Sequence, residues 1–166
     1  MKIFVLVLVS VACLAPVGSA QTPVAGSSRC GKPDPAHTLP AGDRPDHSYG
    51  IVKMKCLWVK ALEMGGARMK EDEITSFSEV TGNSSSDHGF VVGTLSSGDK
   101  VFVRTQGKSV LANGLPQSNA GTWTYAGGTG KLKGITGKGT FSCKSNPDGT
   151  SGCDVAGGYQ LPRLPQ

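Results

Sequence analysis

The stretch Gly121-Thr-Trp-Thr-Tyr-Ala-Gly-Gly-Thr-Gly-Lys-Leu-Lys-Gly-Ile-Thr-Gly-Lys-Gly-Thr-Phe141 decides the fold class of this chain. It starts with aromatic residues that alternate with threonine, passes through a glycine-rich turn, and ends in a second strand pattern that contains glycines. Glycines inside a strand remove side chains where a sheet must bend or coil tightly. The stretch therefore predicts neighbouring strands of a small antiparallel β-barrel.

The first 20 residues have the pattern of a secretory signal peptide. Lys2 gives a positive start, residues 3–17 are almost wholly apolar, and residues 18–20 are small, as a cleavage site requires. The apolar run is too short for a stable membrane span. We therefore expect an exported protein, secreted or periplasmic, with no membrane span. The alternative is a lipoprotein in which Cys13 carries the lipid.

The rest of the chain is long enough for one domain with one core. Residues 21–47 are rich in proline and show no periodic pattern, so we expect an extended N-terminal arm there. Residues 48–166 contain about eight short strand patterns separated by turns, with both faces partly apolar. This pattern predicts an all-β domain, a closed barrel rather than an open sheet.

The formal net charge of +5 is spread over basic residues that are interleaved with acidic ones. A nucleic-acid-binding surface would cluster its basic residues, so we expect no nucleic-acid partner. The run from Gly127 to Lys131 lacks the spacing and the following helix of a phosphate-binding loop. We expect no cofactor.

Four cysteines follow the signal peptide, and an even count in an exported protein predicts two disulfides. Cys143 and Cys153 flank a run of turn-forming residues, which favours a bond between them across a hairpin. Cys30 is then left to pair with Cys56. A metal site is the alternative use of these residues, but they form no Cys-x-x-Cys pair and have no neighbouring histidine, so we expect none.

The register of this hairpin follows from the disulfide. With the two cysteines opposite each other, Phe141 meets Val155 and Gly137 meets Tyr159. Every pair on that face is then apolar or glycine, so one register accounts for the alternation in both strands. Tyr159 provides the aromatic cover that a strand glycine needs.

Residues 127–134, Gly-Gly-Thr-Gly-Lys-Leu-Lys-Gly, follow an aromatic strand and precede a Gly-x-Gly strand. This pattern resembles the glycine signature of the allene oxide cyclase and dirigent-like β-barrels. The run from about residue 87 to 162 is similar to secreted bacterial proteins of uncharacterised role. The resemblance implies an eight-stranded barrel of lipocalin-like shape and, in some relatives, a homo-oligomer. It transfers no catalytic residue to this chain.

The aromatic residues Trp58, Trp123, Tyr125 and Tyr159 are those that we expect in or near the barrel interior. A barrel of this size can just hold one small ligand. The first functional hypothesis is therefore an exported protein that binds a small, mostly apolar molecule through these residues. The alternatives are an isomerase- or cyclase-type enzyme that uses the same pocket, and a packed barrel that acts as an interaction module.

Glu79 and His88 are the candidates for catalysis. If Asn83 and Ser84 form a two-residue turn, Glu79 lies opposite His88 at the edge of an apolar face. Such a pair can transfer protons when burial brings its pKa values near neutrality. The alternative interpretation is a solvated ion pair at the barrel rim.

Overall fold

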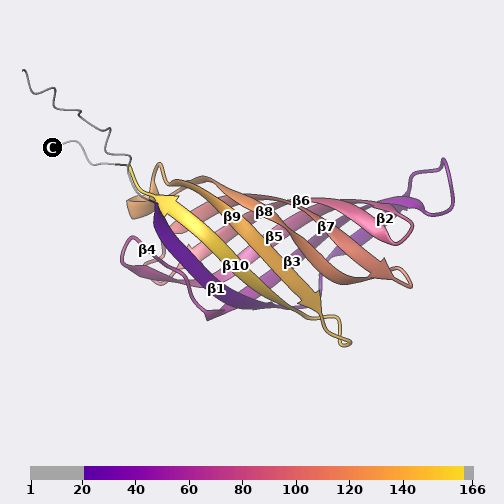
Figure 1. The fold of residues 1–166 in the computed structure, drawn as a ribbon, viewed down its shortest axis with the longest axis horizontal. Helices are drawn as coiled ribbons and strands as arrows, with labels where there is room; N and C mark the ends of the chain where they lie inside the picture. The colour runs from indigo at the N-terminus through magenta and orange to yellow at the C-terminus, as the bar shows by residue number, and fades with distance from the viewer. Residues whose placement is uncertain (1–20, 163–166) are drawn as a thin grey trace, which may run out of the picture.

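The computed structural model describes residues 21–162, so the predicted signal peptide lies outside the described residues. This part of the chain contains no α-helix, and its helical element is the single 3₁₀ turn η1 (Gly130–Leu132). The strands in Figure 1 are β1 (Thr22–Cys30), β2 (Ala36–Pro40), β3 (His47–Lys60), β4 (Glu63–Met64), β5 (Ala67–Thr81), β6 (Ser84–Leu95), β7 (Lys100–Ala112), β8 (Leu115–Gly128), β9 (Thr136–Ser145) and β10 (Ser151–Gln160).

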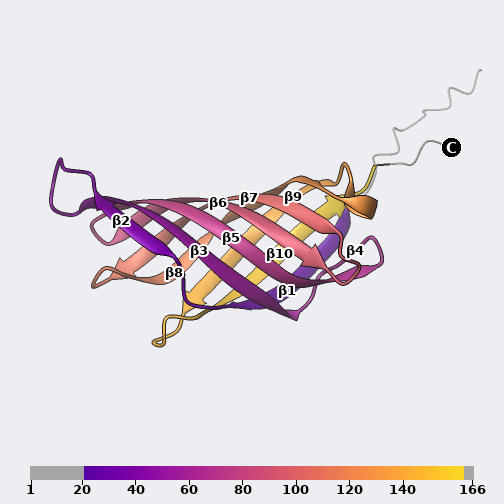
Figure 2. The ribbon, with the colours of Figure 1, turned by 180° about the vertical axis from the view of Figure 1, so that it is seen from behind.

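Eight of these strands form a closed antiparallel barrel, which confirms the predicted fold class. The wall runs in the order β3-β1-β10-β9-β8-β7-β6-β5, and the pairing of β3 with β5 closes it. Closure leaves none of these strands as a free sheet edge. The short strands β2 and β4 add to β3 and β5, and Figures 1 and 2 show them at opposite ends of the barrel.

The N-terminal segment differs from the sequence-based expectation. In place of an extended arm over residues 21–47, β1 is a full strand of the barrel wall, paired with β10 along its length and with β3 near Cys30. The alternation of β1 was hidden because its inward positions include Gly26 and Ser28. A β-carbon at position 26 would lie 2.9 Å from the Trp58 ring, so the small residue makes room for the aromatic one.

The β9–β10 hairpin has the predicted register, with Phe141 opposite Val155 and Gly137 opposite Tyr159. The glycines of these strands provide a flat surface for a ring. Trp123 lies on Gly139 and Gly157, where a β-carbon would overlap its indole. The Trp123 Nε1 atom donates a hydrogen bond to the Thr140 carbonyl oxygen at 3.1 Å. The glycine pattern therefore reflects close packing of an aromatic side chain as well as curvature.

A hydrophobic cluster closes the barrel at the end where β4 and η1 lie (Figure 1). Leu62 and Met64 come from the connection between β3 and β5, while Leu132 comes from η1 and Ile135 follows it. All four side chains are at most 6% exposed. They form a plug beneath the interior of the barrel, which leaves the space above it free for a cavity.

The two disulfides have the predicted pairing. Cys30–Cys56 joins β1 to β3, and Cys143–Cys153 joins β9 to β10. Both fit an oxidising, extracytoplasmic environment.

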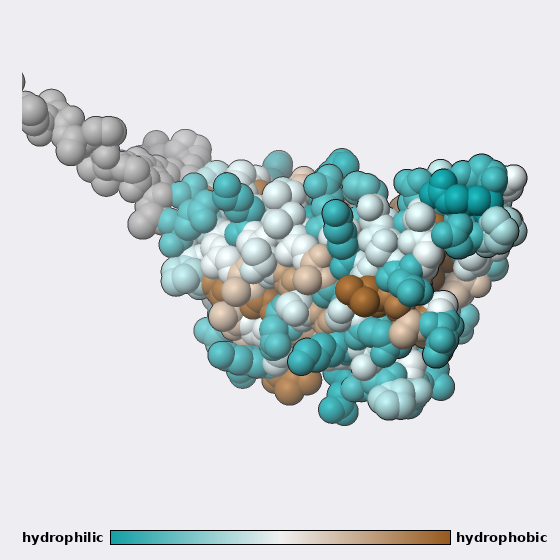
Figure 3. Space-filling view, turned by 45° about the vertical axis from the view of Figure 1, so that its right-hand side comes forward, coloured by the Kyte–Doolittle hydropathy of each residue, from teal (hydrophilic) through white to brown (hydrophobic). Residues whose placement is uncertain are grey.

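Within residues 21–162, no helix is long and apolar enough to cross a membrane. Figure 3 shows a face on which polar side chains predominate and apolar ones form small groups.

Candidate ligand-binding cavity

The interior of the barrel holds a cavity of about 700 Å³ above the plug. This volume lies within the range typical of small-molecule sites. The strands direct alternate side chains inward, and most of those that line the cavity are apolar. The apolar residues that line it include Met54, Trp58, Ile74, Val91, Val103 and Phe141. The lumen is therefore not packed solid, which disfavours the alternative of a filled barrel.

The cavity opens at the end of the barrel away from the plug. Leu115, at the start of β8, lines the cavity although it is 66% exposed, so solvent reaches this point. Pro33 from the β1–β2 connection and Pro147 from the β9–β10 turn line the same end. The turn before Leu115 uses Asn113 and Gly114, both with positive φ (52° and 74°), which is the geometry of a two-residue hairpin turn.

Three of the four aromatic residues expected in the interior line the cavity. Trp58 comes from β3, and Trp123 and Tyr125 from β8. The rings of Trp123 and Tyr125 meet edge to face with centroids 5.0 Å apart, and the Tyr125 hydroxyl donates to Met64 Sδ at 3.1 Å. Tyr159 is 8% exposed in the hydrophobic cluster and is not among the residues that line the cavity.

Asp72 is a buried acid that the sequence interpretation missed. It points inward from β5, is 8% exposed, and lies between Cys56 on β3 and Gly93 on β6. Burial raises the pKa of the Asp72 carboxyl to about 7; the Trp58 indole lowers this pKa, and Glu71 raises it further. The Trp58 Nε1 atom nevertheless forms no hydrogen bond of standard geometry among the described residues.

The position of Asp72 could have been found from the alternation of β5. Counting back in twos from Ser76 through Ile74 places residue 72 on the inward face, and all three line the cavity. The charged run around Asp72 resembles a solvated surface. A register shift between Met69 and Glu71 also breaks the alternation just before it.

A second acid in the wall is fully supplied with hydrogen bonds. Asp87 is 9% exposed and accepts from Ser85 Oγ at 2.8 Å, from Ser109 Oγ at 2.7 Å and from Asn119 Nδ2 at 2.7 Å. Asn119 also donates to Ser109 at 2.8 Å. This network spans β6, β7 and β8 and satisfies the buried carboxylate. It gives the cavity a polar section in its wall.

The two acids are too far apart to act as a catalytic pair. Asp72 lies opposite Gly93, which is six residues along β6 from Asp87 (93 − 87). At about 3.3 Å per residue, this offset separates them by roughly 20 Å. Paired-carboxylate chemistry such as glycoside hydrolysis needs a much shorter distance. The cavity therefore has one satisfied acid and, well removed from it, one acid in apolar surroundings.

The predicted pairing of Glu79 with His88 is wrong. The β5–β6 turn is made by Gly82 and Asn83, because Thr81 lies opposite Ser84. Gly82 has a φ of +56°, a conformation that glycine adopts without strain and that suits the first position of such a turn. The register is consequently displaced from the one that an Asn83–Ser84 turn would produce.

Both residues lie outside the cavity. Glu79 is opposite Ser86, and His88 is opposite Phe77, which is 55% exposed on the outer surface. The Glu79 side chain is 52% exposed, and its Oε1 atom lies 3.1 Å from His47 Nε2. His47 is thus the partner of Glu79, in place of the solvated ion pair with His88 that the alternative interpretation predicted. Neither residue can exchange a proton with a molecule inside the barrel.

No protein-family model matches this chain, and no curated protein matches its sequence. Within residues 21–162, no group of three or more His, Cys, Asp or Glu side chains is arranged to hold a metal ion. The features of this chain that bear on its function are therefore the eight-stranded antiparallel barrel and its cavity.

Proposed function

We propose that this protein binds a small, mostly apolar molecule inside its barrel. The observation that carries the proposal is the cavity of about 700 Å³, open at one end and lined mainly by apolar side chains. Eight-stranded barrels either fill their interior with side chains or hold one small ligand. Small inward residues that line the cavity, such as Ser28, Ser76 and Ser78, favour the second arrangement.

The lining suggests how affinity and orientation arise. An apolar ligand gains roughly 25 cal/mol for each Å² of apolar surface that it removes from water. The rings of Trp58, Trp123 and Phe141 offer large flat surfaces for this contact. The network of Asp87, Ser109 and Asn119 gives a polar section at which a hydroxyl or carbonyl group can form hydrogen bonds. A few polar groups in an apolar pocket are typical of sites that fix one orientation.

Binding can be tested with N-phenyl-1-naphthylamine, whose fluorescence rises in an apolar site. The chain has two tryptophans, and because both line the cavity their emission also reports occupancy. Val103→Trp should narrow the cavity and weaken the signal while the circular dichroism stays that of a β-barrel. Glu79→Gln, on the outer surface, is the matched control. Equal binding by wild type and Val103→Trp would contradict the proposal.

An isomerase- or cyclase-type enzyme is the second candidate, and Asp72 is the observation that favours it. A buried carboxyl with a pKa of about 7 can accept and return a proton near neutral pH. On this hypothesis Asp72→Asn abolishes turnover of a substrate and leaves its binding intact. In a carrier, no turnover would be detected with either form of the protein.

A further inference from the structure

We propose that the ligand is an apolar amine, whose protonated nitrogen lies against Asp72 and whose hydrocarbon body contacts the aromatic wall. This inference rests on the proposed function and specifies the chemical class of the ligand. It follows from the charges that line the cavity, from the difference in hydrogen bonding between Asp72 and Asp87, and from the side chains around Asp72.

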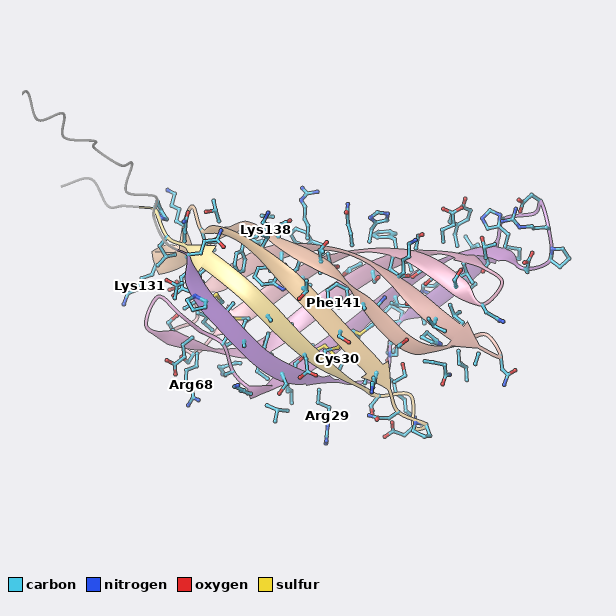
Figure 4. The ribbon with its side chains drawn as sticks, viewed as in Figure 1. Arg29, Cys30, Arg68, Lys131, Lys138 and Phe141 are labelled. Carbon is cyan, nitrogen blue, oxygen red and sulfur yellow. A yellow bond between two sulfur atoms is a disulfide. The ribbon has the colours of Figure 1, made fainter. Side chains whose placement is uncertain are left out.

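The cavity has acidic groups and no basic ones among its described lining residues. Asp72 and Asp87 line it, and no lysine, arginine or histidine does. Basic side chains lie outside: Arg29, Arg68 and Lys131 are exposed, and Figure 4 shows them projecting from the barrel. A fatty acid would bring another carboxylate into this site without a cation to pair with it, which is costly in an apolar environment. A cationic or neutral ligand is therefore favoured.

Asp72 and Asp87 differ in the number of hydrogen bonds that their carboxylates accept from the protein. Asp87 already accepts three hydrogen bonds from its neighbours. The side-chain donor that acts on Asp72 is the Trp58 indole, whose Nε1 atom forms no hydrogen bond of standard geometry among the described residues. A buried carboxylate gains most from a partner that supplies both positive charge and N–H donors. An ammonium group supplies both, so Asp72 is the group that a cation would satisfy.

The surroundings of Asp72 suit such a head group chemically. Asp72 is among the residues that line the cavity, so a ligand inside the barrel can reach its carboxylate. Trp58 and Tyr125 line the same cavity, and aromatic faces attract ammonium groups. The Tyr125 hydroxyl donates to Met64 and is thus not committed to the acid.

A metal ion is a poorer occupant of this position. Within the described residues, Asp72 belongs to no group of three or more His, Cys, Asp or Glu side chains that could hold a metal ion. Hard cations require several oxygen ligands, whereas one ammonium group is satisfied by one carboxylate and aromatic contacts. The single buried acid therefore selects an organic cation.

The test compares three probes that share one hydrocarbon chain: decylamine, 1-decanol and decanoate. Each displaces N-phenyl-1-naphthylamine from ligand-free protein at about pH 8, where Asp72 is ionised according to its pKa of about 7. We expect decylamine to bind about 10- to 100-fold more tightly than decanol, the range for a hydrogen bond to a charged group. Decanoate should bind most weakly. Asp72→Asn should remove the preference for the amine over decanol, while Glu79→Gln should change none of the three affinities.

The outcomes separate this inference from the proposed function. If all three probes bind equally, or if Asp72→Asn keeps the preference for the amine, the ligand class is wrong and binding itself stands. If none of the probes binds and the naphthylamine signal is absent, the proposed function fails.

A wild-type measurement covers the case in which Asp72→Asn does not fold. The groups that act on Asp72 are Glu71 on its own strand and Trp58 on β3, and the acid in turn acts on Tyr125 of β8. The Trp58 indole does not titrate, and burial raises the pKa of Tyr125 above its ordinary value of about 10, so neither group changes its charge near neutral pH. Decylamine affinity should therefore rise between about pH 6 and about pH 8 as Asp72 ionises, while decanol affinity stays constant. An amine affinity that does not change over this interval would overturn the inference.

Discussion

Replacing Asp72 by asparagine should stabilise the ligand-free protein, and the gain should grow with pH. The pKa of Asp72 is raised by burial from 3.8 to about 7, so the folded protein holds a proton that the unfolded chain has already lost. When folding raises the pKa of an acid, the free energy of unfolding falls as the pH increases from the pKa of the unfolded chain to that of the folded protein. Above the folded-state pKa it stays low. The asparagine side chain does not titrate, so the Asp72→Asn variant escapes this loss.

The size of the effect follows from the two pKa values. One pKa unit corresponds to about 1.4 kcal/mol, and the full difference of roughly three units corresponds to about 4 kcal/mol at high pH. Because part of the loss has already occurred at pH 5, the stability difference between the two proteins should widen by about 3 kcal/mol between pH 5 and pH 8.

The assay is urea unfolding of both proteins at each pH with the disulfides intact, followed by tryptophan fluorescence. Glu79→Gln serves as the control, since its carboxylate is half exposed on the outer surface. Equal stability differences between wild type and Asp72→Asn at pH 5 and at pH 8 would show that Asp72 titrates like a solvated acid. Asp72 would then not be a charge that is buried in the cavity wall.

Three further predictions concern the barrel itself. Gly139→Val should lower the free energy of unfolding by roughly 1–3 kcal/mol, because the valine side chain would overlap Trp123. Gly152→Ala is the control: a β-carbon at position 152 has no atom within 4 Å, so this variant should show little change in the same thermal melt. Gly137→Val should cost a similar amount, since residue 137 has a φ of +148° and a β-carbon there would overlap the backbone of β10; a variant that melts at the wild-type temperature would contradict this. Replacing Cys143 and Cys153 by serine should cost roughly 2–4 kcal/mol in urea unfolding, and an unchanged midpoint would show that this bond does not constrain the unfolded chain.

The β9–β10 hairpin shows what the sequence could predict. Its two cysteines fix one cross-strand pair, and the alternation on either side then agrees with one register over the whole hairpin. The β5–β6 hairpin has no such covalent marker. There the sequence offers adjacent candidate turns in the run Gly82-Asn83-Ser84, and the choice depends on which residue takes the positive φ. Because the turn is formed by Gly82 and Asn83, Glu79 lies opposite Ser86 and not opposite His88.

The candidate site was predicted in part for a similar reason. Aromatic residues signal burial by their size, so Trp58, Trp123 and Tyr125 were correctly expected in the interior. Polar residues that line a cavity carry a weaker signal. Asp72 and Asp87 look like the surface acids around them, so only the alternation of their strands indicates that their positions face inward. Near Asp72 a register shift interrupts that alternation.

Asp72 also connects the stability of this barrel with its proposed activity. A core that served stability alone would place an apolar or neutral residue at this position, because the ionised acid costs several kcal/mol above neutral pH. Proteins carry such costs mainly at functional sites, where a locally unfavourable group is compensated when its partner binds. The same substitution, Asp72→Asn, is therefore expected to raise stability and to remove the selectivity for amines. Burial alone predicts the gain in stability, whereas only a ligand-binding role predicts the loss of selectivity. The selectivity measurement therefore distinguishes a ligand-binding acid from an incidental one.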